Sequence, residues 1–194
     1  MIVKQGAEID EYELAVRCSK GDSSACKELY TRYAARVTYL CSRYAMGPEE
    51  AEDLMHDSMI AVFRSIGRFK FRGKGSLNAW ISRVAVNTAI DRYRKAVRQE
   101  ATAESMAAEP SETEDITAED AMRVPLEVLE KMIALLPDTK RIIFNMFCIE
   151  GLSHKEIAGM LGITEKTSSS LLSKARRMLS ERIREYDSKT MEDE

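Results

Sequence analysis

The chain has 194 residues, 31% of them charged, and a formal net charge of −3. This is ordinary globular composition, and the length fits one or two small domains. No apolar run approaches membrane-spanning length and the N-terminal residues lack the pattern of a signal peptide, so we expect a cytoplasmic protein without membrane insertion. The four cysteines are widely spaced and there are only two histidines, which argues against a zinc site or a disulfide framework. Cys41 and Cys148 lie among apolar residues and are predicted to be buried, reduced thiols.

Charge is distributed unevenly along the chain. Ten basic residues and one acid lie between Arg64 and Arg98, whereas eight acids and no base lie between Gln99 and Met122. Such blocks indicate a basic contact surface next to an acidic tether. Two solvated faces that happen to differ in sign explain the charges about as well.

The hydrophobic pattern is helical almost throughout, without a convincing strand. In the first half of the chain it predicts four helices, at about Asp10–Ser19, from near Ser23 to Tyr44, at about Glu49–Ile66 and at about Leu77–Arg98. A basic, glycine-bracketed loop, Arg68–Gly75, joins the last two helices, and Ser76 is the predicted N-cap of the fourth. The inner stripe of that helix is expected to be Leu77, Trp80, Ile81, Val84, Ala85 and Thr88.

The second half of the chain begins with a disorder-prone segment. Gln99–Val124 is rich in Ala, Glu, Ser and Thr and has few large apolar residues, which predicts a flexible acidic linker with at most weak helicity. Two apolar stripes follow it, Leu126, Leu129, Ile133 and Leu136, and then Ile142, Ile143, Met146 and Phe147. The predicted fold class is therefore all-α, with two small helical domains, residues 1–98 and 125–194, joined by the linker 99–124.

The strongest local signal is a helix-turn-helix over Leu152–Arg177. Ser153 and Glu156 have the spacing of a capping box, and Gly162 suits the left-handed turn. The last helix is expected to turn Ser168, Leu172, Ala175, Leu179 and Ile183 inward. Its outer face carries Lys166, Ser169, Ser170, Ser173, Lys174, Arg176 and Arg177, where serines can read bases and the cations can anchor phosphates. A plain antiparallel helix pair remains the alternative.

Two blocks of sequence together resemble the extracytoplasmic-function (ECF) sigma factors of bacterial RNA polymerase. The segments LYTRYAARVTYLCSRY, PEEAEDLMHDSMIAVFRSIGRF and GSLNAWISRVAVNTAIDRYRKAVR resemble the promoter-melting domain of that family, region 2. The segment LPDTKRIIFNMFCIEGLSHKEIAGMLGITEKTSSSLLSKARRML resembles region 4, which reads the −35 element. The resemblance implies a subunit that directs promoter-specific initiation, and not an enzyme. Ser168 departs from the valine or isoleucine usual in the family, and Ser169 and Leu171 from residues that are often basic.

The resemblance also implies roles for particular residues. Glu52, Asp53, His56 and Asp57 would bind the clamp helices of the largest polymerase subunit. The residues that would contact and melt the −10 element are Arg68, Lys70, Phe71, Arg72, Lys74, Ser76, Arg83, Asn87 and Arg94. The outer face of the last helix would contact the −35 element. Further implied partners are promoter DNA, the flap of the second-largest subunit and an anti-sigma factor, with no cofactor and no metal.

Other interpretations stay open at this point. A stand-alone helix-turn-helix regulator would need a dimerisation or effector domain, and a helical adaptor would leave the basic loop unexplained. The acids near Asp53 could simply favour the start of a helix, and Asn87 could make a capping or inter-helix hydrogen bond. The linker could thread a basic channel of the polymerase or act only as a tether. An enzyme is the weakest option, because no nucleophile–base pair or phosphate-binding loop is recognisable.

Overall fold

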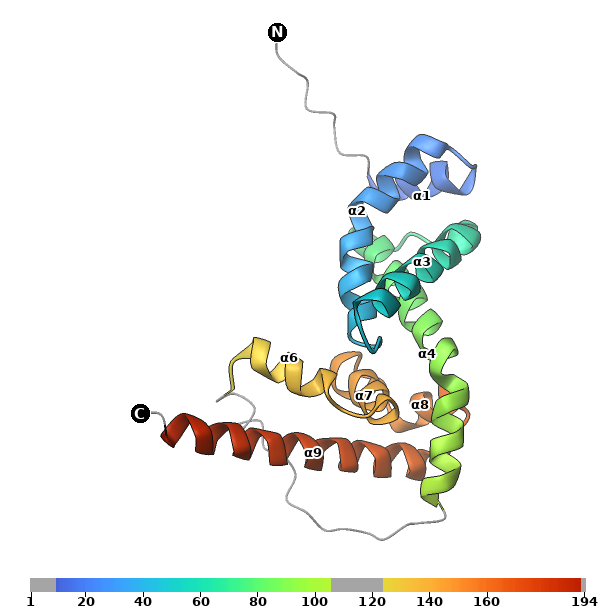
Figure 1. Ribbon diagram of the computed structural model, residues 1–194. Helices are drawn as coiled ribbons and strands as arrows, with labels where there is room; N and C mark the ends of the chain where they lie inside the picture. The colour runs from blue at the N-terminus through green and yellow to red at the C-terminus, as the bar shows by residue number, and fades with distance from the viewer. Residues whose placement is uncertain (1–9, 106–123, 193–194) are drawn as a thin grey trace. The chain divides into compact units, whose positions relative to one another are not determined.

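The computed structural model describes residues 10–105 and 124–192 of the chain, and every element in these ranges is helical (Figure 1). No strand occurs in the described ranges, so the all-α prediction is confirmed there. The chain divides into two compact units, Met1–Ala89 and Ile90–Glu194. Among the described helices, none is long and apolar enough to cross a membrane.

The first unit is built from three α-helices, a 3₁₀ turn and the start of a long fourth helix. They are α1 (Glu11–Ser19), α2 (Ser23–Ser42), α3 (Pro48–Ser65), the 3₁₀ turn η1 (Ile66–Arg68) and α4 (Ser76–Ser105). Asp22 caps α2, because its Oδ1 accepts from the backbone N–H groups of Ser24 (2.9 Å) and Ala25 (3.2 Å). The Arg17 guanidinium donates to the other oxygen of this carboxylate at 2.8 Å and holds the pKa of Asp22 below its ordinary value.

The core of this unit lies where α2 and α3 cross and where α4 begins (Figure 1). Leu29 and Leu54 are completely buried there, as is Leu77 at the start of α4. The buried Ser58 hydroxyl donates to the Leu54 carbonyl at 2.7 Å, which satisfies the one polar group in this part of α3. The burial of Leu77 in this core therefore fixes where α4 begins, and with it where the basic loop ends.

The predicted inner stripe of α4 is only partly correct. Leu77, Ile81 and Ala85 are buried, as expected. Trp80, Val84 and Thr88 are only half-buried, and Ala89 is buried in their place. The neighbour of Trp80 is a loop residue, Phe69, whose ring centroid lies 5.6 Å from that of the indole.

The cysteine prediction is half right. Cys41 is completely buried, but Cys148 is exposed, because the π-helical turn η2 (Asn145–Ile149) buries Asn145 and Met146 and turns Cys148 outward. Cys18 is also buried, and burial raises the pKa of its thiol to about 12, with the neighbouring Cys26 thiol contributing. Pattern alone did not single out Cys18, since its neighbours in sequence are polar.

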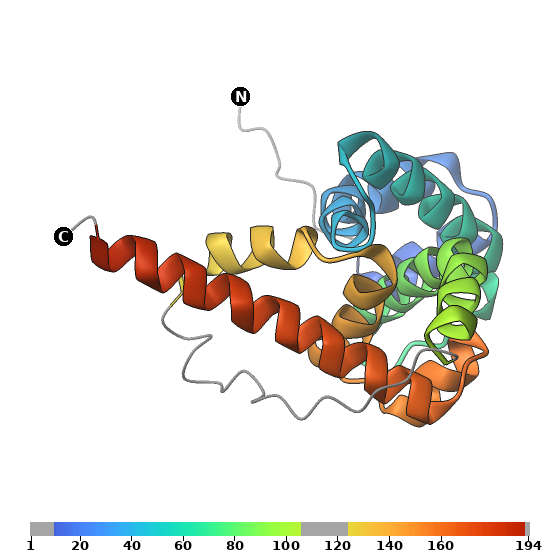
Figure 2. The same cartoon turned by 60° about the horizontal axis from the view of Figure 1, so that its bottom comes forward.

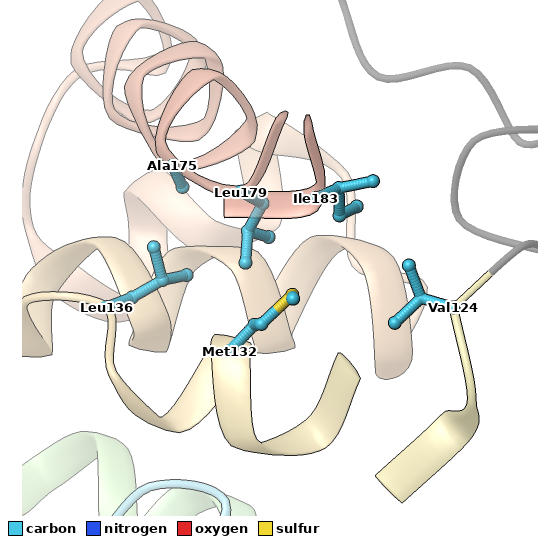
Figure 3. Close-up of a cluster of buried hydrophobic side chains, with 6 residues drawn as sticks. All are labelled: Val124, Met132, Leu136, Ala175, Leu179 and Ile183. Carbon is cyan, nitrogen blue, oxygen red and sulfur yellow. The ribbon is translucent and has the colours of Figure 1, made fainter. Parts of the chain in front are cut away.

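The second unit contains α6 (Leu126–Ala134), α7 (Asp138–Phe144), η2, α8 (His154–Leu161) and α9 (Glu165–Glu192). α6 lies alongside the C-terminal part of α9 in both views (Figure 2). Figure 3 shows the buried side chains between them: Val124, Met132, Leu136, Ala175, Leu179 and Ile183. This cluster holds the long final helix, α9, against α6.

One prediction about this half of the chain needs correction. Leu126 was expected to face the core but is 71% exposed, because it is the first residue of α6, and Met132 is buried instead. The predicted linker 99–124 begins while α4 is still continuing, through Ser105, and ends with Val124 already in the core. The remainder of the linker, residues 106–123, lies outside the described residues.

Candidate nucleic-acid interface

The basic loop between α3 and α4 exposes five of the nine residues predicted to contact the −10 element. Gly73 and Gly75 have φ angles of +107° and +86°, which residues with a side chain rarely adopt, so the turn requires glycine at both positions. Exposed loop side chains are those of Arg68, Lys70, Phe71, Arg72 and Lys74. The loop therefore presents four cations and an aromatic ring to solvent from a backbone that is bent at fixed points.

The start of α4 differs from the prediction. Ser76 is already the first helical residue, and its hydroxyl accepts from the backbone N–H of Arg72 at 3.2 Å instead of capping α4. The Leu77 N–H, at the N-terminus of the helix, donates to the Glu11 carboxylate at 3.3 Å. The predicted N-cap role of Ser76 is therefore wrong. Its hydroxyl ties the loop back on itself, and a carboxylate from another helix takes the capping position.

One face of α4 carries the remaining −10 candidates. Ser76, Arg83, Asn87 and Arg94 follow one another at intervals of seven, four and seven residues, which are close to whole helical turns. Arg83 and Asn87 are exposed, and Arg94 pairs with Asp91 at 2.8 Å. Among the described residues, none is a hydrogen-bond partner of the Asn87 side chain, which is exposed at mid-helix.

The acidic candidates lie on the outer face of α3. Glu52, Asp53, His56 and Asp57 are all exposed, while Leu54 on the opposite side is completely buried. A hollow of about 620 Å³ borders this face, lined by Asp57, Ile60, Ala61, Arg64, Ser65, Arg68 and Thr88. Sequence reasoning missed Ile60, which is 47% exposed and lies three residues after Asp57 on the same face. The sequence does indicate this residue, because an isoleucine at position 60 lies outside the helical spacing of the buried residues of α3.

The helix-turn-helix is formed as predicted. The Ser153 Oγ accepts from the Glu156 N–H at 3.3 Å, and the Glu156 Oε2 accepts from the Ser153 N–H at 2.9 Å, which is a complete capping box. Gly162 has φ +70° and ψ +41°, and its N–H donates to the Ala158 carbonyl at 2.8 Å. Leu161 is completely buried beside this turn. The turn geometry follows from local sequence chemistry.

An unusual polar contact lies between α8 and α9. Ser168 is completely buried at a position where the resemblance leads one to expect an aliphatic residue, and its Oγ lies 3.0 Å from His154 Nδ1. The imidazole stacks on Phe147, with ring centroids 4.6 Å apart. The hydroxyl is therefore satisfied within the unit, which explains how the core accepts a serine there. Leu171 is also completely buried and belongs to the core of α9.

The outward face of α9 places the −35 candidates in an ordered arrangement. Lys166, Ser169, Ser170 and Ser173 are exposed, and Lys174, Arg176 and Arg177 are half-buried. At about 100° per residue, Lys174 and Arg176 lie on opposite flanks, each roughly 80° from the line through Lys166. Arg176 already contacts the unit itself, because its guanidinium lies 5.7 Å from the Phe147 ring centroid, and Arg177 pairs weakly with Glu181 at 3.9 Å.

Comparison with known proteins identifies both halves of the chain. The family model described as Sigma-70 region 2 matches residues 29–99, and that of Sigma-70, region 4 matches residues 126–179. An "ECF RNA polymerase sigma-E factor" of Haemophilus influenzae is 30% identical over 186 residues, which cover 91% of this chain and 96% of that relative. The chain belongs to the ECF RNA polymerase sigma factors.

Two further comparisons also cover most of this chain. The ECF RNA polymerase sigma factor SigE of Mycolicibacterium smegmatis is 30% identical to this sigma factor over 184 residues, covering 91% of it and 69% of the relative. A solved structure of CnrH in complex with the cytosolic domain of CnrY has a TM-score of 0.43 and 21% identity, covering 88% of this sigma factor and 95% of that chain. The two family models and the Haemophilus influenzae relative confirm the expected family and its two-region order, and α1 lies before the region 2 match.

Proposed function

We propose that this sigma factor divides promoter recognition between two domains, and that residues 1–98 bind the core polymerase and open the −10 element while residues 125–194 read the −35 element. Promoter-specific initiation by RNA polymerase is the function of the family to which it belongs. The region 2 match removes the support for a stand-alone regulator or an adaptor. Residues 99–124 would connect the two domains.

The observation that carries the −10 assignment is the continuity of the exposed basic loop with the exposed face of α4. Taking a base out of the stack costs a few kcal/mol, and an aromatic ring together with backbone-contacting cations can repay that cost. Phe71 is 40% exposed and is flanked by Lys70 and Arg72, which supplies both elements. Asn87 can donate and accept at one base edge, so it suits a reader of the same strand.

The −35 assignment uses the outward face of α9. The exposed Lys166 and the serines at its centre are candidate readers, because short hydroxyls and a lysine can reach base edges in the major groove. Lys174 and Arg176 on the flanks are candidate phosphate anchors. Both cations also have a contact within the unit, since the Arg176 guanidinium lies against the Phe147 ring and the Lys174 charge acts on the Glu100 carboxylate.

Lys174→Ala should weaken promoter binding by the polymerase assembled with this sigma factor to the same extent for every −35 sequence. The loss of one phosphate contact should also reduce the slope of log affinity against log salt by about one. Filter binding over a series of salt concentrations measures both quantities. Lys131→Ala, which removes an exposed lysine on α6, is the matched control and should change neither. A loss confined to one base position would make Lys174 a reader instead.

The core-polymerase surface is proposed to be the acidic face of α3. Its four exposed polar side chains lie beside the partly apolar hollow at Ile60, and such a combination suits a basic partner helix with an apolar contact at its centre.

Asp53→Lys with Asp57→Lys should reduce co-purification with core polymerase at least tenfold, on the order expected when attraction becomes like-charge repulsion. Helicity should not change, because both side chains are exposed. The control is Glu181→Lys with Glu185→Lys, an exposed acidic pair of the same four-residue spacing on α9. Equal co-purification of both variants with wild type would show that α3 is not the docking surface.

Three partner assignments rest on the family resemblance alone. They are the flap of the second-largest polymerase subunit, an anti-sigma factor, and a polymerase channel for the acidic linker, most of which lies outside the described residues. They remain predictions.

A further inference from the structure

Helix α1 contacts the end of the basic loop through a single carboxylate. Glu11 lies in the first turn of α1, and its Oε2 accepts from the backbone N–H of Gly75 at 2.8 Å and from that of Leu77 at 3.3 Å. Its Oε1 accepts from the Tyr33 hydroxyl at 3.4 Å. Burial raises the pKa of Tyr33, and the neighbouring Glu11 carboxylate raises it further, so this hydroxyl keeps its proton and remains a donor.

The next residue of α1 contacts the middle of the loop. The Tyr12 ring lies 5.6 Å from the Phe71 ring, centroid to centroid, at an interplanar angle of 58°, which is a favourable tilted arrangement. Tyr12 is 56% exposed and Phe71 is 40% exposed, so the pair forms at the surface and is not part of the core. Two consecutive residues of α1 therefore hold the basic loop at its middle and at its end.

Physical chemistry explains why these contacts would order the loop. The first N–H groups of a helix lack an intrahelical acceptor, and the N-terminus carries partial positive charge, so a carboxylate placed there makes strong, charge-assisted hydrogen bonds. Gly73 and Gly75 give the loop backbone wide freedom when nothing restrains it. Apart from Glu11 and Tyr12, few described contacts oppose that freedom. The Arg72 N–H donates to Ser76 Oγ and the Ser76 N–H to the Gly73 carbonyl, and the Phe69 ring lies against Trp80 before the bend.

We infer that Glu11 is a positioning residue for promoter opening, and that with Tyr12 it holds the loop Arg68–Gly75 in the conformation that receives the extruded −10 base. The inference rests on the proposed function of the loop. Preorganisation of this kind lowers the entropic cost of binding the strand without any contact between Glu11 and DNA. Since α1 lies before the region 2 match at residues 29–99, the assignment extends the −10 machinery to a part of the chain outside that match.

The test uses polymerase assembled with four forms of the sigma factor: wild type, Glu11→Gln, a form with residues 69–74 replaced by glycine and serine, and the combination. The probe is a single-stranded oligonucleotide carrying the non-template −10 sequence of a promoter at which this polymerase initiates. Glu11→Gln should weaken binding of the probe on the order of tenfold, the worth of one charge-assisted hydrogen bond. In the loop-replaced form, the same substitution should have no further effect.

A matched control and a second readout separate positioning from folding. Glu13→Gln removes an exposed acid two residues further along α1 and should bind the probe like wild type. In free Glu11→Gln protein, the backbone amides of Gly75 and Leu77 should exchange with solvent on the order of tenfold faster, while amides of α2 and α3 keep wild-type rates.

Three other outcomes would contradict either the role of Glu11 or the function of the loop. Wild-type probe binding by Glu11→Gln, with weakened binding by the loop-replaced form, would overturn the inference and leave the loop function intact. An equal loss from Glu11→Gln in both backgrounds would also overturn it, because Glu11 would then act elsewhere than through the loop. Wild-type binding by the loop-replaced form would refute the proposed function of the loop itself.

Discussion

Replacing residues 69–74 by glycine and serine is expected to lower promoter opening on the order of 100-fold, with core binding unchanged. The change removes the exposed Phe71 ring and three cations, Lys70, Arg72 and Lys74, but keeps the glycine bends and the chain length. Losing one stacking platform costs about 1–3 kcal/mol, and losing the backbone contacts adds to it, while every tenfold in rate or affinity corresponds to about 1.4 kcal/mol. Permanganate footprinting of a promoter that the wild-type polymerase opens measures the bubble directly.

The same footprint distinguishes the loop from the α4 face. Asn87→Ala should lower opening roughly tenfold and should relax the preference at one base position, since a bidentate contact discriminates by about 1–3 kcal/mol. Asn78→Ala is the matched control, because nine residues along a helix place Asn78 on the opposite side of α4 from Asn87. If the loop replacement and Asn87→Ala both give a wild-type bubble and wild-type base preference, region 68–87 does not melt the promoter.

Leu161→Ala is expected to cost about 2–5 kcal/mol of stability and to unfold much of the helix-turn-helix. Leu161 is completely buried at the end of α8, directly before the left-handed Gly162, so truncation of its side chain leaves a cavity in the core beside the turn. A unit of this size has only a small margin of stability, so recognition of the −35 element should be lost. Hydrogen exchange, followed on peptides from α8 and α9 of the full chain, localises the effect.

The control for this substitution is Leu135→Ala. Leu135 lies in the same unit but is 68% exposed, so its removal should change stability by no more than about 0.5 kcal/mol. Binding of the single-stranded −10 probe should persist in the Leu161→Ala polymerase, because that probe does not involve α9. Undisturbed exchange across α8 and α9 would show that the turn does not depend on Leu161.

Features that depend on neighbouring residues could be predicted from the sequence. The Ser153–Glu156 capping box and the Gly162 turn are local hydrogen-bonding and backbone effects, and both lie where the pattern indicated. The inward stripe of α9 from Ser168 to Ile183 is also confirmed, because a 3.6-residue period is enough to select a helix face. The roles of individual residues were predicted from the family resemblance, because helical periodicity selects a helix face but does not indicate a function.

Several of the incorrect or missing predictions involve tertiary packing. Trp80 reads as a core residue by spacing, but a loop ring covers it instead of a helix, and Leu126 reads as core although it lies on the first, uncovered turn of α6. No pattern links Glu11 to Gly75, because the two residues meet only once α1 has packed beside the start of α4. Ser168 departs from the aliphatic residue expected at its position, and its hydrogen-bond partner His154 lies on the other helix of the motif. Such contacts are set by tertiary packing and leave no periodic trace in the sequence.

The contact between Phe69 and Trp80 makes tryptophan fluorescence an intrinsic probe of the basic loop. Trp80 is the one tryptophan in the whole sequence, so all indole fluorescence of the free protein comes from a single site. Its ring is half-buried and lies against a residue of the basic loop, which means that any displacement of the loop changes the polarity around the indole. The emission wavelength of the unlabelled protein therefore reports on loop order, and Glu11→Gln can be compared with wild type before polymerase or DNA is added.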